Sequence, residues 1–284
     1  MARALADGID ADVALVGPDD VIGDIPAGLR IGVGTWGEGS GERSVSSAGR
    51  LSAVAVETAA RMALAGEVDA IVTGPVHKAA LDAAGYRYPG LTEFLAHLAA
   101  DADVAMMLAT GTLRVVLVTT HMALRDVPAA VTESRVVRAG EITRDALRRW
   151  WDIAAPRLAV CALNPHAGEG GLFGDEDDRV LRPAAERLGA AGPLPADTVF
   201  VKALRGEFDA VLAPYHDVGM TAVKVAGFGS GVNVTLGLPF VRTAPDHGTA
   251  FDIAGTGQAD PSSMRAALDL AARLAVRGRQ RPDD

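Results

Sequence analysis

The stretch Val115–His121, V-V-L-V-T-T-H, decides the fold class, because a short apolar run ends abruptly in polar side chains. Valine-rich runs of this length are typical of strands that are buried on both faces of a parallel sheet. Similar runs recur along the chain and are separated by longer segments with helical spacing. These further runs lie at residues 13–16, 70–72, 104–108, 158–163, 210–213 and 232–236. Strands that alternate with helices predict an α/β fold with a largely parallel sheet.

The longer segments carry the signals of helix ends. A serine-rich stretch opens a predicted helix over residues 47–65, and Gly66 ends it. A last helix is predicted from about residue 262 to 277, and a shorter one over 91–100. The chain of 284 residues fits one large domain or two subdomains that share a cleft, since single cores stop growing at roughly 250 to 300 residues.

Composition and charge exclude several classes of protein. Hydrophobic residues make up 49% of the chain and aromatic residues only 5%, which favours a core of Val, Leu, Ile and Ala. The formal net charge of -9 argues against nucleic acid or an anionic membrane surface as a partner. Cys161 is the only cysteine, so no internal disulfide is expected. The sequence shows neither a secretory signal nor an apolar run of ~18 residues, and we predict a cytoplasmic protein.

Four of the six histidines follow predicted strands, namely His77, His121, His166 and His216. Ligands of open α/β sheets bind at the carboxyl ends of the strands, so several of these side chains are expected to meet in one cleft. Neutral imidazoles suit Zn, Co or Mn, and three of them leave positions open for substrate or water. Their wide separation matches no local metal motif.

Three loops are richer in glycine or polar residues than a turn requires. N-P-H-A-G-E-G-G at 164–171 holds three glycines and indicates backbone brought close to a ligand. G-F-G-S-G-V-N-V-T at 227–235, flanked by Lys224 and Arg242, is either an anion cradle or a flexible approach to a strand. The stretch 246–261 is neither a dinucleotide fingerprint nor a phosphate-binding loop of the Walker type.

Several motifs together resemble the 4-hydroxythreonine-4-phosphate dehydrogenase family of pyridoxal phosphate biosynthesis, the PdxA family. They are V-T-G-P-V-H-K at 72–78, T-T-H-M-A-L-R-D-V at 119–127, N-P-H-A-G-E-G-G at 164–171, G-P-L-P-A-D-T at 192–198, Y-H-D at 215–217 and F-G-S-G-V-N-V-T-L-G-L-P-F-V-R-T at 228–243. The likeness runs from about residue 10 to the end. It implies two α/β subdomains with largely parallel sheets and a cleft between them, as in isocitrate and isopropylmalate dehydrogenases. Residues 1–88 and 235–284 would form the cofactor side, and residues 89–234 the metal, substrate and dimerisation side.

The resemblance also implies site residues. A divalent metal (Zn, Mg or Co) would be held at a homodimer interface, with one ligand supplied across it, by His121, His166 and His216. Substrate contacts carry over to Thr92, Lys224, Asn233 and Arg242, and catalytic roles to Lys78, Asp197 and Lys224. The NAD or NADP cofactor would lie along His247, Gly248, Thr249, Ala250, Asp252 and Asp260.

Three departures from the family pattern bear on the substrate. Leu91 stands where G-H-T-E has a histidine, and Val218 stands where Y-H-D-Q-G has a glutamine. Two polar pocket groups are thus replaced by apolar ones. The sequence also lacks the expected opening strand and its T-P-G-D-P-A-G-I-G-P-E-like loop.

The implied reaction is the NAD(P)-dependent and metal-dependent oxidation of 4-phosphohydroxy-L-threonine to 2-amino-3-oxo-4-phosphohydroxybutanoate, which decarboxylates to 3-amino-2-oxopropyl phosphate. One alternative is a sister dehydrogenase for phosphothreonate, phosphoerythronate or a cis-diol, which Leu91 and Val218 favour. Another is a non-catalytic protein that binds a small phosphorylated metabolite. The presence of all three histidines argues against the last, because binding alone needs no metal.

Overall fold

The computed structural model describes residues 1–6, 8–36, 43–227 and 229–279, and the chain divides into two compact units. The first unit comprises Met1–Ala102 and Leu238–Val276, and the second Asp103–Gly237 and Arg277–Asp284. The expected boundaries after residues 88 and 234 therefore lie short of the observed ones. The helix α5 (Leu91–Leu98) packs on α3 (Val45–Leu64), which places it in the first unit. The cofactor and metal roles of the two units stay predictions.

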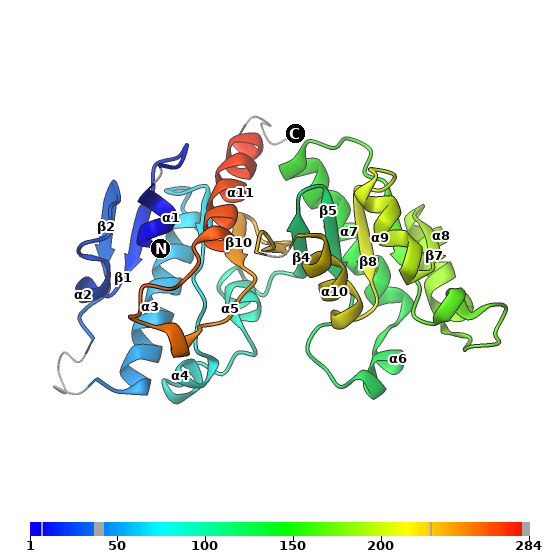
Figure 1. The fold of residues 1–284 in the computed structure, drawn as a ribbon, viewed down its shortest axis with the longest axis horizontal. Coiled ribbons are helices and arrows are strands. Elements are labelled where there is room, and N and C mark those ends of the chain that lie inside the picture. Colours follow the sequence, from blue (N-terminus) through cyan, green and yellow to red (C-terminus); the bar gives the residue numbers. More distant parts are fainter. Residues whose placement is uncertain (7, 37–42, 228, 280–284) are drawn as a thin grey trace. The chain divides into compact units, whose positions relative to one another are not determined.

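The first unit contains two pairs of parallel strands. Strand β1 (Ala14–Gly17) pairs with β2 (Leu29–Gly32), and β3 (Ala70–Val72) pairs with β10 (Val241–Pro245). The remaining elements of this unit are α1 (Ala2–Ala6), α2 (Asp19–Ile22), α4 (Lys78–Ala83), η4 (Phe251–Ile253) and α11 (Ser262–Arg279) as far as Val276. Figure 1 shows α11 beside the β10 strand. Strands β2 and β10 were not predicted from the sequence, because Arg30 and Arg242 interrupt their apolar runs.

Helix α3 begins as its sequence predicts. The Ser44 side chain accepts a hydrogen bond from the backbone N–H of Ser47, and the Ser47 side chain accepts one from the backbone N–H of Ser44. Gly49 lets α3 approach α4 closely, because a Cβ atom there would lie 1.8 Å from the carbonyl oxygen of Ala80. This close packing fixes the position of α4, whose first residue is Lys78.

The second unit contains six strands, which lie in the order β9-β4-β5-β8-β6-β7. Strands β5 (Leu113–Leu117), β8 (Ala210–Ala213), β6 (Leu158–Cys161) and β7 (Ala191–Leu194) are parallel. Strand β4 (Ala105–Thr110) is antiparallel to both β5 and β9 (Val232–Leu236). The prediction of a largely parallel α/β fold is confirmed, with β4 as its exception. A two-residue connection at Gly111–Thr112 joins β4 to β5, and so short a connection closes only an antiparallel pair.

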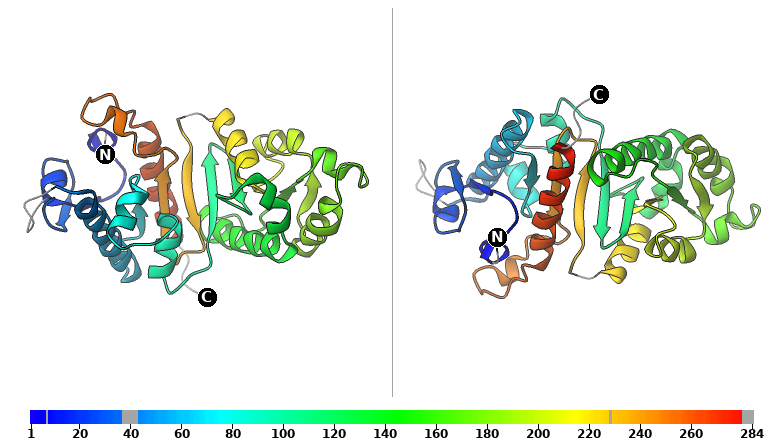
Figure 2. Two further views of the ribbon diagram at one scale, coloured as in Figure 1. Left: turned by 90° about the horizontal axis from the view of Figure 1, so that it is seen from below. Right: turned by 90° about the horizontal axis from the view of Figure 1, so that it is seen from above.

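Helices cover both faces of this sheet. Figure 2 shows α7 (Glu133–Trp151) on one face and α9 (Ala196–Leu204) and α10 (His216–Ala226) on the other. The core between them is aliphatic, as the composition predicts, and Val115, Val199 and Val211 are fully buried in it. Shorter elements complete the unit, namely η1 (Leu124–Asp126), α6 (Val127–Ala130), η2 (Pro165–Gly168), η3 (Asp177–Leu181) and α8 (Arg182–Leu188).

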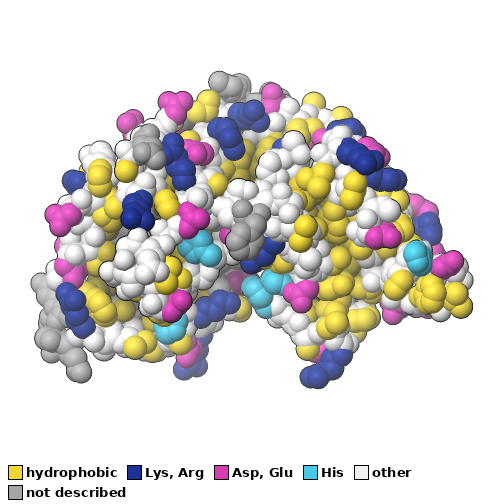
Figure 3. Space-filling model, in the orientation of Figure 1, with side chains coloured by type: hydrophobic (Ala, Val, Ile, Leu, Met, Phe, Trp, Pro, Cys, Tyr) yellow, Lys and Arg dark blue, Asp and Glu magenta, His cyan; other side chains and the backbone are white. Residues whose placement is uncertain are grey.

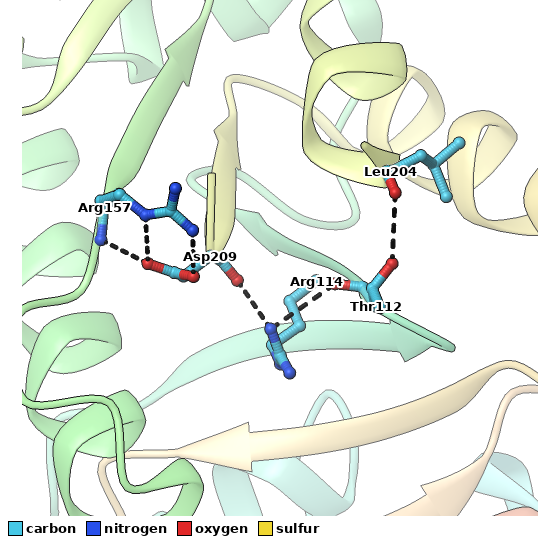
Figure 4. A network of polar contacts seen from close by, with 5 residues as sticks. All are labelled: Thr112, Arg114, Arg157, Leu204 and Asp209. Carbon is cyan, nitrogen blue, oxygen red and sulfur yellow. Dashed lines mark hydrogen bonds and ion pairs between the residues drawn. The ribbon is translucent and has the colours of Figure 1, made fainter. Parts of the chain in front are cut away.

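A polar network fixes the beginnings of two neighbouring strands (Figure 4). Asp209, just before β8, accepts hydrogen bonds from the backbone N–H of Arg157 at 2.7 Å and from its guanidinium at 3.0 Å. Arg157 directly precedes β6. The carbonyl oxygen of Asp209 accepts a third bond at 3.0 Å from Arg114 of β5. The amino ends of these strands are thus tied together, which leaves their carboxyl ends to carry the histidine loops.

No helix within the described ranges is both long enough and apolar enough to cross a membrane. The cytoplasmic location stays a prediction.

Candidate functional site

Two of the predicted ligand histidines lie side by side at the carboxyl ends of neighbouring strands. His121 follows β5, and His216 follows β8 as the first residue of α10. Strands β5 and β8 are paired with Leu117 opposite Ala213, so both chains leave the sheet at the same level. The two imidazole centroids are 5.2 Å apart. The parallel register therefore converts two distant sequence positions into one pair.

Asp217 orients the His216 ring. The Nδ1 atom of His216 and the Oδ1 atom of Asp217 are 2.7 Å apart. An aspartate on one ring nitrogen fixes the tautomer so that Nε2 carries the lone pair, which is the usual support of a metal-binding histidine. The donor set of this pair fits a divalent metal that prefers nitrogen ligands.

His166 lies on a loop with an uncommon backbone. The residues His166, Ala167 and Glu169 have φ values of 52°, 56° and 43°, in the left-handed region. Each such residue costs on the order of 1 to 3 kcal/mol and is kept only where the surroundings impose it. Gly168, between them, has φ 78°. The three glycines of N-P-H-A-G-E-G-G thus serve a left-handed turn that presents the imidazole.

His166 does not complete a three-residue cluster with the pair. Within the part of the chain that the structure describes, no group of three His, Cys, Asp or Glu side chains could hold a metal ion. The His166 ring instead lies 6.4 Å from the ring of Phe173. The fourth strand-end histidine, His77, packs edge to face on Phe251 with centroids 5.2 Å apart.

Arg242 is a buried cation in the first unit. It points from β10 with 4% of its surface exposed, and its Nη2 donates a hydrogen bond of 2.6 Å to the Thr73 hydroxyl. Burial lowers the pKa of Arg242 to about 10, and the charge of Glu93 opposes that shift. The guanidinium therefore stays positive at pH 7 and complements an anionic ligand. Thr92 precedes Glu93 on α5 and is half-buried.

Asn233 and Lys224 are the substrate candidates of the second unit. Asn233 lies on β9, and its Oδ1 atom is buried with no hydrogen-bond partner among the described residues. A buried acceptor of this kind costs about 1 to 3 kcal/mol until a donor meets it. Lys224 is exposed in the last turn of α10. The loop between α10 and β9 is fixed by a hydrogen bond of 2.8 Å between Ser230 and Thr110. Phe228 of this loop lies outside the described residues.

The two remaining catalytic candidates begin helices. Lys78 is the first residue of α4 in the first unit, and Asp197 lies in the first turn of α9 in the second. Both side chains are exposed. Asp197 also lines a groove between α9 and α10.

The predicted cofactor residues form one loop between β10 and α11. Ala250 has φ 45°, and Phe251 contacts His77 beside Lys78. Hydrogen bonds from Ser262 lower the pKa of Asp260. The loop carries His247, Gly248, Thr249, Ala250, Asp252 and Asp260. They therefore lie along one surface segment near the start of α4.

The residues that depart from the family pattern are both packed. Leu91 begins α5 with 7% of its surface exposed, and Val218 on α10 packs against the core of the second unit. Val218 also lines the α9/α10 groove. Neither position offers a polar group to a ligand.

Sequence reasoning missed Thr73 and Asp177. Thr73, in V-T-G-P-V-H-K, accepts the Arg242 hydrogen bond, and Asp177 supports the His166 loop. The signal for Thr73 was its position directly after the strand Ala70–Val72. Asp177 lies within a charged run, D-E-D-D at 175–178, and such a run is also typical of a solvated surface.

Comparisons with known proteins agree on one family. The profile described as "Pyridoxal phosphate biosynthetic protein PdxA" matches residues 31–271. A 4-hydroxythreonine-4-phosphate dehydrogenase of Caulobacter vibrioides is 51% identical over 78% of this chain and 70% of its own. A candidate D-threonate 4-phosphate dehydrogenase of Bradyrhizobium diazoefficiens is 50% identical over 80% of this chain and 70% of its own. The crystal structure of the Klebsiella pneumoniae 4-hydroxythreonine-4-phosphate dehydrogenase superposes with a TM-score of 0.80 at 40% identity, covering 96% of this chain and 86% of that one.

The matched segments span between 65% and 72% of the curated relatives' own lengths.

Proposed function

Because this chain belongs to the PdxA family, we propose that it oxidises the secondary alcohol of 4-phosphohydroxy-L-threonine with NAD or NADP and one divalent metal ion per subunit. The product, 2-amino-3-oxo-4-phosphohydroxybutanoate, is a β-keto acid and loses carbon dioxide to give 3-amino-2-oxopropyl phosphate. The named relatives at about half identity are dehydrogenases, which supports an oxidoreductase.

The single observation that carries the proposal is the His121 and His216 pair, with imidazole centroids 5.2 Å apart at the ends of two parallel strands. These two residues and His166 would hold the metal. When bound, the metal supplies Lewis-acid stabilisation of the developing alkoxide while the nicotinamide accepts the hydride. Asp217 holds the His216 ring in the orientation that such a ligand needs.

The substrate would be held by a buried cation and a buried acceptor. Arg242 supplies a positive charge in a desolvated place, where a charge-assisted hydrogen bond to phosphate or carboxylate is strong. Asn233 offers an Oδ1 atom that accepts from a substrate hydroxyl or ammonium group. Thr92 in the first unit adds a hydroxyl group for the substrate, and Lys224 in the second unit adds a further positive charge. Lys78 and Asp197 remain the candidates for proton transfer.

The cofactor would lie along the loop from His247 to Asp260. Ala250 has a left-handed backbone there, and the Phe251 ring packs on the His77 ring. Backbone groups in such a turn are suited to an anionic or ribosyl ligand.

We assign the third metal ligand to His166 of a second copy in a homodimer. An apolar groove supports a dimer, since Val201 and Leu204 of α9 are 45% and 44% exposed and Val225 of α10 is 83% exposed. The groove has a volume of about 590 Å³. Figure 3 shows hydrophobic side chains gathered over α9 and α10 in the second unit. Large exposed apolar patches mark interaction sites.

A sister reaction on D-threonate 4-phosphate is the second candidate. The Bradyrhizobium relative carries that name, and Leu91 and Val218 remove two polar groups that the family pattern places near substrate. Both reactions need the same metal and cofactor. Only the substrate separates them.

The test is an assay of NADH and NADPH formation with both substrates, on the wild type and on His121→Ala, His166→Ala and His216→Ala. We expect each replacement to remove bound metal, measured by elemental analysis, and to lower activity at least 100-fold while the circular dichroism spectrum is kept. His97→Ala is the matched control, because His97 is an exposed histidine that pairs with Asp101 in the first unit. Full metal content and activity in all three variants would contradict the proposal.

A further inference from the structure

We infer that Asp177 is the positioning residue that holds the His166 loop in its ligand-presenting conformation, an inference that rests on the proposed metal site. Asp177 is 0% exposed and is the only fully buried acidic side chain among the described residues. It lies at the start of η3, eleven residues after His166 in the chain. Burial of a carboxyl group is unfavourable unless its hydrogen-bonding capacity is used.

Both carboxylate oxygens of Asp177 accept hydrogen bonds from the backbone just before His166. Its Oδ1 accepts a hydrogen bond from the Leu163 N–H at 2.8 Å, and its Oδ2 accepts one from the Asn164 N–H at 3.0 Å. The next residue, Pro165, has no N–H. The carboxyl group therefore satisfies the last two backbone donors before the left-handed turn begins.

The Asp177 side chain also lies near the part of the turn that follows His166. A Cβ atom at Gly168 would lie 3.7 Å from Cβ and Oδ2 of Asp177 and 2.8 Å from the carbonyl oxygen of Gly174. Asp177 thus binds the loop before His166 and lies close to Gly168 after it. A single buried group in this position can hold a left-handed backbone, which is otherwise unfavourable for residues other than glycine.

A neighbouring contact strengthens this support. The Asn164 amide Nδ2 donates a hydrogen bond of 2.8 Å to Oε2 of Glu176, the residue before Asp177. Residues 176 and 177 begin the widened helical turn that continues into α8. Widened turns of this kind are rare and are frequent at functional sites. The loop is therefore anchored to the start of η3.

His166 itself has no ring contact with Asp177, so the effect of Asp177 on the metal runs through the backbone. Asp177→Asn keeps the size of the side chain and removes one acceptor, because an amide nitrogen donates only. One buried N–H of Leu163 or Asn164 then faces another donor. We expect the loop to leave its left-handed conformation and His166 to move away from its ligand position.

The test measures affinity for Co²⁺ by equilibrium dialysis on the full chain, together with the melting temperature of the metal-free protein. We expect Asp177→Asn to weaken Co²⁺ binding about 10- to 100-fold, the range for residues that support metal ligands from behind. Asp177→Glu, which keeps both acceptors on a longer stem, should restore part of the affinity. Asp178→Asn is the matched control, because Asp178 is exposed and pairs with Arg182 at 2.6 Å.

A second readout separates positioning from general support of the fold. The Cε1–H nuclear magnetic resonance signal of His166, identified by its loss in His166→Ala, should shift in metal-free Asp177→Asn, while the His121 and His216 signals stay. If Asp177→Asn is unfolded by circular dichroism, the same measurements on Asp177→Glu decide the question, with a smaller loss of affinity and a shifted His166 signal expected.

The outcomes distinguish this inference from the proposed function. Wild-type Co²⁺ affinity in a folded Asp177 variant, with His166→Ala still losing the metal, would overturn the role of Asp177 and leave the metal site standing. A lowered melting temperature with unchanged affinity and an unshifted His166 signal would overturn it in the same way. A wild-type protein that binds no Co²⁺, or a His166→Ala variant that binds it normally, would overturn both.

Discussion

At the scale of single residues, each unit carries candidate groups of its own, namely a buried polar group in each unit and the paired histidines in the second. Arg242 and the Asn233 amide oxygen are desolvated, so each interacts strongly with a matching ligand group and poorly with a mismatched one. Leu91 and Val218 act in the opposite sense, since they offer no hydrogen bond where the family pattern has polar residues. Specificity at this scale depends on which substrate groups meet a partner.

We predict that the Leu91→His, Val218→Gln double variant raises kcat/KM for 4-phosphohydroxy-L-threonine about tenfold or more, which corresponds to ~1.4 kcal/mol of transition-state binding. The physical reason is that apolar residues leave substrate polar groups desolvated and unpaired, at about 1 to 3 kcal/mol each. Steady-state kinetics on both phosphorylated substrates measure the change. Leu98→His is the control, because it makes the same change two turns along α5. No gain from an already efficient wild type would show that the two apolar residues do not set the substrate.

At the scale of elements, the strands of the second unit are joined by side-chain hydrogen bonds at their amino ends and lead into the histidine loops at their carboxyl ends. The Arg157 and Asp209 bonds join β6 to β8 before either strand begins (Figure 4). At their carboxyl ends, the same strands lead to His166 and His216. The rigid sheet between the two ends of the strands lets strained loops persist, because the core cannot easily relax around them.

We predict that the Asp209 contribution to stability is lost in acid. Burial pushes the pKa of Asp209 upward, but the hydrogen bonds and charge of Arg157, with the charge of Arg114, outweigh it and lower the pKa. A lowered folded pKa means that the stabilisation is complete above the ordinary value of about 3.9 and disappears as the pH falls through the lower folded value. Asp209→Asn should cost about 1 kcal/mol near pH 7, or about 2 to 4 °C in Tm, because Arg157 is largely exposed.

Calorimetry of both proteins between pH 7 and pH 2 tests this, and the difference in Tm should be constant to about pH 4 and then shrink. Asp175→Asn, which breaks an exposed pair with Arg179, should change Tm little. A difference that grows as the pH falls would contradict the assignment.

At the scale of the whole molecule, one copy of the chain holds only part of the proposed ligand set. The His121 and His216 pair lacks a third ligand among the described residues, and the groove of the same unit exposes Val225 and its neighbours. A homodimer with two-fold symmetry would cover the groove and complete two equivalent metal sites at once.

We predict that the wild type has twice the 29.2 kDa mass of one chain by light scattering. The Val201→Asp, Val225→Asp double variant should shift toward the monomer, because an interface of apolar side chains does not accommodate unpaired charges. Its metal affinity should fall with it. Val21→Asp, at an exposed position on α2 of the first unit, is the control. A monomeric wild type with full activity would rule out the shared site.

The sequence by itself determined the elements whose signals are local. Apolar runs, a serine cap and a stopping glycine placed β3, β8 and β9 at their observed residues, and α3 within two residues, because burial and capping depend on neighbours along the chain. The residues of several motifs likewise identify the family from the sequence alone.

Only the tertiary structure decided which of these pieces meet. The pairing of β5 with β8 brings His121 and His216 together across more than ninety residues, and the antiparallel β4 depends on a two-residue turn that composition does not reveal. Asp177 looks like one of several surface acids in D-E-D-D, and only packing shows it buried beneath the His166 loop. Contacts between distant segments depend on strand register and close packing, which no local pattern encodes.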